Sequence, residues 1–154
     1  MLTFTGRALV FESDYLAAIR EKKIVSGSVC IIRNEGPKGG PGMPETLAVT
    51  IGLALSGVQR VALVTDGRFS GASSGPCIGH VSPEAAEGGP IAAVRDGEKI
   101  MIDIPNRRLN IKLSDEEIRD RLRHYNPPVR VIPSGFMRRY VKLVGSAAKG
   151  AVLD

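Results

Sequence analysis

The chain has 154 residues, of which 43% are hydrophobic and 24% charged, and its formal net charge is +5. This length fits one domain with a buried core, and the absence of any apolar run near the roughly 20 residues that cross a bilayer excludes a transmembrane helix. Basic residues are dispersed and aromatic residues make up 5%, so we expect no nucleic-acid partner; the charge fits a weak attraction for anionic substrates equally well. The N-terminal residues MLTFTG lack the basic start and apolar core of a signal peptide, which makes a cytoplasmic location the default expectation.

The first half of the chain predicts alternating strands and helices. Short apolar runs predict strands at 8–11, 29–33 and 61–64. We expect one helix capped by Ser13 or Asp14 and continuing through Glu21, and a second from about 44 to 55. A helix between two apolar strands is typical of a parallel crossover unit.

The second half predicts more strands than helices. We expect a short helix starting at Ser82, a strand at 91–94, a hairpin turn at 95–98 and two further strands at 100–104 and 109–113. A helix capped by Ser114 and Glu117 should follow and end before Pro127. Residues 136–143 predict a helix or a strand, and residues 145–154 a loose tail. Taken together, the pattern predicts one mixed α/β domain with a closed or nearly closed sheet and a few flanking helices.

Two glycine-rich segments stand out, at residues 35–45 and 65–75. The second follows the buried strand at 61–64, so its turn delivers polar groups to one place. Two such loops in one small domain suggest the wall of an active site. Neither has the glycine spacing of a P-loop or of a dinucleotide-binding turn, which argues against ATP, GTP or NAD as the ligand.

Three residues of these loops are candidates for chemistry. Glu45 stands near a helix start, where it can cap the helix or bind a hard cation such as magnesium. Asp66 is read as a side chain that stabilises the turn. Ser70 lies in no Ser-His-Asp pattern or nucleophile elbow, but it could act as a base if a nearby metal lowered its hydroxyl pKa.

The histidines and cysteines give weaker signals. His80 lies in a glycine-flanked loop, where it could act in acid–base chemistry, bind substrate or support its neighbours structurally, whereas His124 is expected at the surface. Glu84, together with Glu87, is read as an acid at a helix start. Cys30 and Cys77 form no zinc-like or cluster-like spacing, so both are read as structural.

Long motifs in order resemble the C-terminal domain of the dihydroxy-acid dehydratase and phosphogluconate dehydratase family. They occupy residues 35–45, 65–71, 75–85, 87–91, 102–109 and 147–152. The Gly-His-Val-Ser-Pro-Glu run at 79–84 and the Asn-Arg-Arg segment at 106–108 are more similar to the dihydroxy-acid branch. The resemblance covers nearly the whole chain.

This resemblance implies a hydro-lyase that converts 2,3-dihydroxy acids to 2-keto acids in branched-chain amino-acid synthesis. It implies an iron–sulfur cluster as Lewis acid and magnesium to hold the substrate. Ser70 would be the base that takes the C2 proton, Glu45 a magnesium ligand and His80 a substrate-binding residue. The implied fold is a swivelling, β-barrel-like α/β domain similar to one in aconitase.

The sequence departs from the family pattern in two ways, so not every property of the family can be transferred to this chain. Where the dihydroxy-acid branch shows an arginine after its serine motif, this chain has Ala72-Ser73-Ser74. The cluster cysteines and the other magnesium ligands belong to a long N-terminal domain, so we expect this chain to be inactive alone and to have that domain or subunit as its partner, within a homo-oligomer. A sugar-acid dehydratase domain, a non-catalytic interaction module and an anion-binding protein are the alternatives.

Overall fold

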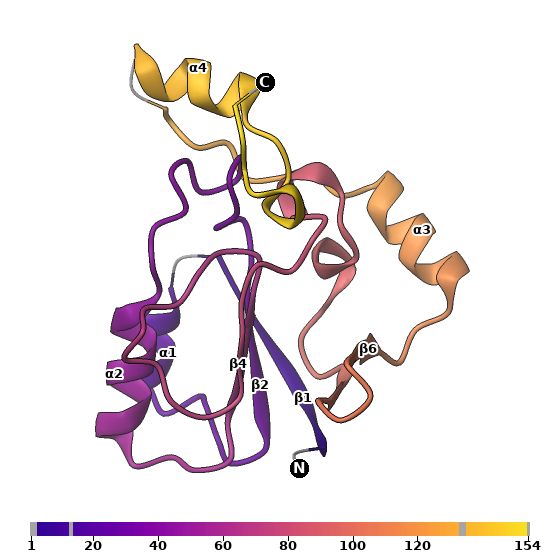
Figure 1. Ribbon diagram of the computed structural model, residues 1–154. Coiled ribbons are helices and arrows are strands. Elements are labelled where there is room, and N and C mark those ends of the chain that lie inside the picture. The colour runs from indigo at the N-terminus through magenta and orange to yellow at the C-terminus, as the bar shows by residue number, and fades with distance from the viewer. Residues whose placement is uncertain (1–2, 13, 133–134, 154) are drawn as a thin grey trace.

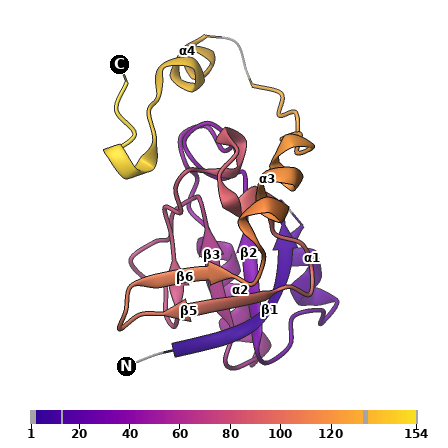
Figure 2. The same ribbon diagram turned by 90° about the vertical axis from the view of Figure 1, so that its right-hand side faces the viewer.

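A curled six-stranded sheet organises the computed structural model, which describes residues 3–12, 14–132 and 135–153 (Figure 1). The strands are β1 (Thr3–Phe11), β2 (Ser28–Ile32), β3 (Ala62–Thr65), β4 (Cys77–Ile78), β5 (Lys99–Asp103) and β6 (Arg108–Ile111), in the spatial order β4-β3-β2-β1-β5-β6. β1 to β4 are parallel, β5 pairs antiparallel with β1, and β6 pairs antiparallel with β5. The sheet forms an open half-barrel, which confirms the predicted mixed α/β class (Figure 2).

Each face of the sheet has its own core, because successive strand residues point to opposite sides. Helices α1 (Tyr15–Arg20) and α2 (Leu47–Ser56) cover one face, where they pack on the side chains of Cys30, Ile32 and Leu63. Val29, Ile31 and Val64 face the other core, which the single-turn helices η1 (Ala85–Glu87) and η2 (Pro90–Ala93) and helix α3 (Asp115–Arg123) help to cover. Since β2 is buried along its whole length, it is the centre of the molecule.

The parallel strands bring the two glycine-rich segments together. β2 ends at Ile32 and β3 at Thr65, and these strands are paired in parallel register. The carboxyl ends of parallel neighbours meet at one edge of a sheet, where ligands of open α/β sheets commonly bind. The segments that follow β2 and β3 therefore lie side by side, together with the turn after β4.

Several predicted elements are confirmed with shifted ends, and others are wrong. Residues 91–94 were expected as a strand, but residues 91–93 belong to η2 and Val94 follows it as the C-cap, because Pro90 occupies the first turn and the residues are buried without alternation. A short apolar run cannot distinguish strand from buried helix. The turn at 95–98 therefore joins η2 to β5 instead of closing a hairpin, and Gly97 (φ 81°) donates its amide to Ala8 of β1.

Helix ends also differ from the expectations. α2 starts at Leu47, so Glu45 precedes the helix and does not cap it, and Ser82 caps no helix because η1 begins at Ala85. The Ser114–Glu117 capping box of α3 is confirmed. Ser13, one of the two proposed caps of α1, lies outside the described residues, and Asp14 makes no capping bond through its side chain.

The C-terminal residues form structure of their own. Residues 136–143 are a helix, α4 (Phe136–Leu143), and the expected loose tail contains η3 (Ala147–Lys149) and a bridge between Val144 and Leu153. α4 lies apart from the sheet in both views (Figures 1 and 2). Within the described part of the chain, no helix combines the length and apolar character needed to cross a membrane.

Candidate active site

The buried carboxylate of Asp66 joins three segments of the chain at the edge of the sheet. Its Oδ1 accepts a hydrogen bond from the Glu35 amide at 2.9 Å, and its Oδ2 accepts from the Asn34 amide at 3.0 Å and the Ala85 amide at 2.9 Å. The residue has no exposed surface, so these backbone amides satisfy a charge that would otherwise be costly to bury. Among the described residues, the hydrogen bonds of the Asp66 side chain all come from other segments. It therefore fixes the start of the other glycine-rich segment and of η1, and not its own turn, where it was predicted to act.

Glu84 holds the first glycine-rich segment in a similar way. Its carboxylate accepts hydrogen bonds from the amides of Lys38, at 2.9 Å, and Gly39, at 2.8 Å. The loop folds back so tightly that a Cβ at Gly40 would lie 2.8 Å from the Cα of Glu35, which requires glycine there. Sequence reasoning read Glu84 as a helix-start acid and missed this contact, because it joins residues 45 positions apart.

The two glycine-rich segments touch directly near Glu45 and Arg68. These residues form a parallel bridge, and the Thr46 amide donates to the Arg68 carbonyl at 3.0 Å. The Arg68 guanidinium returns a hydrogen bond from Nε to the Met43 carbonyl at 2.5 Å. Arg68, the bridge partner of Glu45, is two residues before Ser70, so the predicted metal ligand and the predicted base lie on adjoining backbone segments. The Glu45 side chain is exposed to solvent.

Ser70 begins a small turn of its own. Its half-buried hydroxyl oxygen accepts a hydrogen bond from the Ala72 amide at 3.3 Å, and its carbonyl accepts from the Ser73 amide at 3.2 Å. A donor directed at the hydroxyl oxygen favours negative charge there. Among the described residues, the Oγ of neighbouring Ser73 is buried without a hydrogen-bond partner. The loop therefore offers a further polar atom beside Ser70.

His80 lies next to the same loop. Its amide donates to the Gly67 carbonyl at 2.8 Å, and its backbone is left-handed, with φ of 56°. The residue is exposed and lines the mouth of a cavity of about 440 Å³. Aliphatic side chains form most of its wall, including Ile31, Val64 and Ile78, and no Lys or Arg contributes to it.

No complete metal site is formed by the residues that the structure describes, since no three His, Cys, Asp or Glu side chains gather in a suitable group. Cys30 is fully buried, and this burial raises the pKa of its thiol to about 12. The half-buried Cys77 thiol donates to the Ser74 carbonyl at 3.4 Å, and burial raises its pKa as well. A thiolate is the form that binds iron, so both cysteines suit the predicted structural role.

Arg130 ties the C-terminal residues to this site. Its guanidinium forms an ion pair with Glu35, at 2.5 Å, and Glu35 is the residue whose amide Asp66 holds. Burial raises the pKa of the Glu35 carboxyl, and Arg130 opposes the shift. The sequence contained no signal for this pair, because it joins residues 95 positions apart.

The family model described as "Dihydroxy-acid/6-phosphogluconate dehydratase C-terminal" matches residues 1–151. The chain belongs to this family. It is 52% identical to "Dihydroxy-acid dehydratase" of Aquifex aeolicus (strain VF5) and 54% identical to that of Thermodesulfovibrio yellowstonii, with 100% of the chain and 28% of each relative covered. A relative with the same description from Archaeoglobus fulgidus is 53% identical, with 99% of the chain and 28% of that protein covered. The resemblance found in the motifs is confirmed, and the chain spans little more than a quarter of these relatives' length.

Replacing Asp66 by Asn should destabilise this family member strongly. An amide group presents donors to backbone amides that are themselves donors, so at least one buried N–H loses its acceptor. We expect the free energy of unfolding to fall by about 2–4 kcal/mol, measured by urea denaturation. The matched control Asp120→Asn changes an exposed carboxylate of α3 and should cost less than about 1 kcal/mol. Equal costs for the two variants would contradict the anchoring role of Asp66.

The stability contribution of Glu84 should fall as the pH rises. Burial raises the folded-state pKa of this carboxyl above its ordinary value of 4.5, although the amides of Gly39 and Lys38 oppose the shift. The folded state then binds the proton more tightly than the unfolded state, so stability falls from about pH 4.5 up through the folded pKa. The destabilisation caused by Glu84→Gln, measured by urea denaturation at a series of pH values, should therefore shrink across this window. A cost that grows with pH would contradict the direction of the shift.

Proposed function

We propose that this chain provides the base-bearing part of a hydro-lyase site that converts a 2,3-dihydroxy acid to a 2-keto acid. The observation that carries the proposal is the bridge between Glu45 and Arg68, because it joins the two motif-bearing loops two residues before Ser70. The family membership and the printed description of the relatives, "Dihydroxy-acid dehydratase", support the reaction class. A cytoplasmic role in branched-chain amino-acid synthesis is part of the same proposal.

In this reaction ionised Ser70 takes the proton from C2 of the substrate as the bond between C3 and its hydroxyl oxygen breaks. The departing hydroxide takes up a proton to become water, so that the substrate loses one proton and one hydroxide in all. The resulting enol becomes the 2-keto acid. The Ala72 amide, which donates to the Ser70 oxygen, favours the ionised form that such a base requires. His80, on the neighbouring turn, is proposed to hold the substrate by a hydrogen bond.

Glu45 is proposed as one ligand of magnesium. The exposed carboxylate at the rim of the sheet suits a hard cation, but it supplies one ligand where several are needed. Magnesium bound there would supply positive charge that lowers the pKa of a nearby hydroxyl. The residues described here do not fit an iron–sulfur cluster, since both cysteines have raised thiol pKa values and Cys30 is buried in the sheet.

The remaining groups are proposed to come from the N-terminal part of a complete dehydratase, either on the same polypeptide or on a partner subunit. The chain covers only 28% of each relative described above, which leaves room for the cluster ligands and the other magnesium ligands. We therefore propose that the 154 residues alone are inactive and that the complete enzyme is a homo-oligomer.

The cavity beside His80 favours an aliphatic substrate over a sugar acid, which is the alternative within this family. Its wall is mainly Ile, Val and Leu, and it offers no Lys or Arg for a phosphate group. An alkyl group gains free energy by leaving water for such a surface, whereas the several hydroxyl groups of a polyol would find only a few polar side chains, those of His80, Ser82 and Asn110, to replace water.

Replacing Ser70 by Ala should abolish most of the activity. The assay uses a hybrid in which this chain replaces the matching segment of the A. aeolicus relative, reconstituted with iron–sulfur cluster and magnesium. We expect 2-keto acid formation from 2,3-dihydroxyisovalerate to fall by about 10²–10⁴-fold, the usual contribution of a general base. Ser26→Ala, on an exposed turn far from the site, is the control. Full activity of Ser70→Ala would refute the base assignment, and a folded hybrid without activity would favour a non-catalytic module.

Replacing Glu45 by Gln should weaken magnesium binding in the same hybrid. Loss of a charged oxygen ligand should raise the magnesium concentration for half-maximal activity by about tenfold or more. The exposed carboxylate of Glu116 lies on α3, and Glu116→Gln is the matched control. An unchanged magnesium requirement in Glu45→Gln would remove Glu45 from the metal site.

A further inference from the structure

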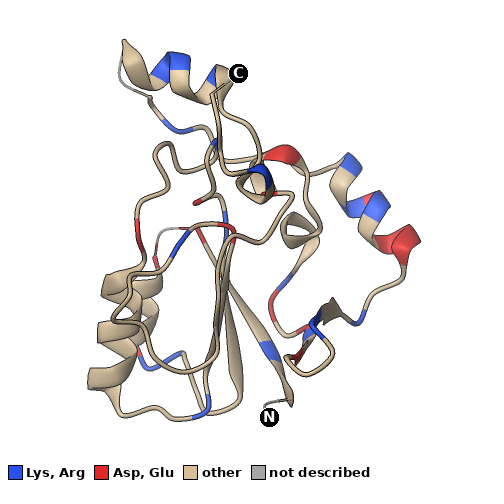
Figure 3. Cartoon of the chain, viewed as in Figure 1, with Lys and Arg blue, Asp and Glu red and all other residues tan. Residues whose placement is uncertain are grey.

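The net positive charge of the chain comes from its C-terminal arm, which we define as residues 126–132 and 135–153, because basic and acidic residues balance in the rest of the sequence. This arm contains Arg130, Arg138, Arg139, Lys142 and Lys149, and it contains no Asp or Glu. The basic residues of α4 lie on a helix that stands away from the sheet (Figure 3). None of Arg138, Arg139 and Lys142 forms an ion pair within the described part of the chain.

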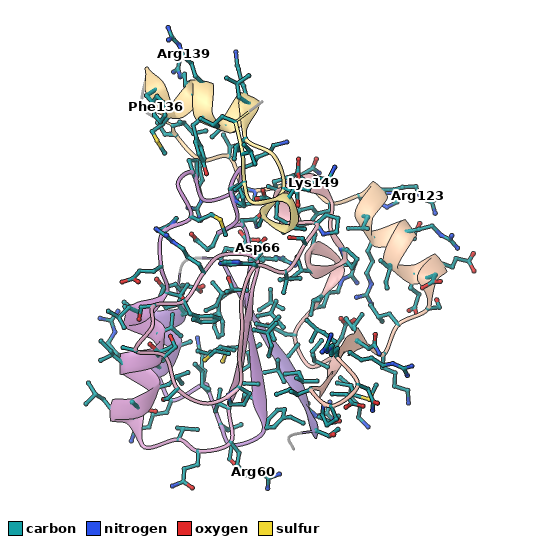
Figure 4. The ribbon with its side chains drawn as sticks, viewed as in Figure 1. Arg60, Asp66, Arg123, Phe136, Arg139 and Lys149 are labelled. Atoms are coloured by element: carbon teal, nitrogen blue, oxygen red, sulfur yellow. The ribbon has the colours of Figure 1, made fainter. Side chains whose placement is uncertain are left out.

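The arm also exposes large apolar side chains. Phe136 is 67% and Leu143 50% exposed, and with Arg139 they form one stripe of α4, at spacings of three and four residues. Phe136 and Arg139 point away from the rest of the molecule (Figure 4). Val129 and Val131, in the segment that leads to α4, are 97% and 96% exposed. Scattered apolar residues are ordinary at a surface, but a stripe framed by charges of one sign is typical of an interaction surface.

α4 lacks the features that stabilise a helix by itself. It is eight residues long, and no side chain caps its N-terminus. Arg138 and Lys142 are four residues apart and repel each other. A helix this short is marginal in water without packing. A partner that supplies carboxylates and an apolar surface would relieve both deficits.

Two surfaces of this chain, one apolar and one acidic, fit such a helix poorly. The groove between α1 and α2 is apolar, with a volume of about 930 Å³, but Arg20 and Lys22 line it. The acidic first turn of α3 (Asp115, Glu116 and Glu117) belongs to a helix without large exposed hydrophobic residues. A second copy of the chain that bound α4 in the groove would bring like charges together, and one that bound it on α3 would bury no large apolar side chains. The surface of another polypeptide is therefore favoured as the partner of α4.

The position of the arm indicates which polypeptide would bind α4. Arg130 pairs with Glu35, and a Cβ at Gly42 would lie 3.6 Å from Met137 of α4. Both contacts are to the glycine-rich segment that ends at Glu45. A partner seated on α4 would consequently adjoin the loops of Glu45 and Ser70.

We propose that α4 and the arm around it form the docking element for an acidic, partly apolar surface on the part of the dehydratase that lies outside the matched segment. This proposal rests on the proposed function, because that function requires a partner at the same loops. The arm would place the partner's groups against Glu45 and Ser70, and its basic residues would pair with carboxylates across the interface.

Hydrogen exchange of the α4 amides tests this interaction without an activity assay. In the hybrid with the A. aeolicus relative, we expect amides 136–143 to exchange at least about tenfold more slowly than in the 154-residue chain. The variant Arg138→Glu/Arg139→Glu/Lys142→Glu should restore fast exchange in the hybrid and leave the thermal midpoint of the chain alone unchanged. Arg20→Glu/Arg60→Glu/Lys112→Glu makes the same change of charge on exposed residues elsewhere and should leave the protection intact.

Other outcomes would overturn the proposal. Equal exchange in the chain and the folded hybrid would show that α4 docks on nothing there. Protection that grows with the concentration of the chain alone would assign the surface to a second copy, and protection by anionic phospholipid vesicles would assign it to a membrane. If the hybrid does not fold, the matched segment of the intact A. aeolicus relative is measured instead, and fast exchange there overturns the proposal. Protection should persist in Ser70→Ala, which separates docking from the proposed chemistry.

Discussion

The structure of the candidate site depends on one buried carboxylate. Asp66 accepts amides from Asn34, Glu35 and Ala85, so a single side chain determines how the segments after β2 and β3 and the start of η1 lie relative to one another. Its charge is compensated by the dipoles of these backbone amides. Glu84 then fixes the outer part of the first glycine-rich segment, and the bridge between Glu45 and Arg68 closes the contact between the two loops.

These contacts explain why a small domain can hold loops so rich in glycine in one arrangement. Glycine lowers the stability of a loop by increasing its freedom in the unfolded chain, and buried carboxylates that accept several amides offset that cost. The tight turn at Gly40 shows why glycine is used despite this cost, because a side chain there would clash with the backbone of Glu35. The loops are thus ordered by groups beneath them, while Glu45 and His80 remain exposed at the rim.

The domain presents an incomplete site and the basic helix α4 on the same side. Glu45 offers one ligand, and no group of three metal-binding residues gathers among the described residues. Within the same part of the chain, Arg138, Arg139 and Lys142 of α4 form no ion pair. The ion pair between Arg130 and Glu35 connects the arm to the loop that Asp66 holds. A docked partner would therefore act on the arm and on the site loops together.

The sequence by itself determined the fold class, most strands, the capped helix α3 and the family, because these follow from local periodicity, capping residues and long motifs. It also selected Ser70, Glu45 and His80 as candidates, whose roles remain predictions. Only the tertiary structure decided that residues 91–93 belong to η2, that Glu84 supports a loop and that Arg130 reaches Glu35. The physical reason is the same in each case: burial and long-range hydrogen bonds join residues far apart in the chain, and no local pattern encodes which partners will meet.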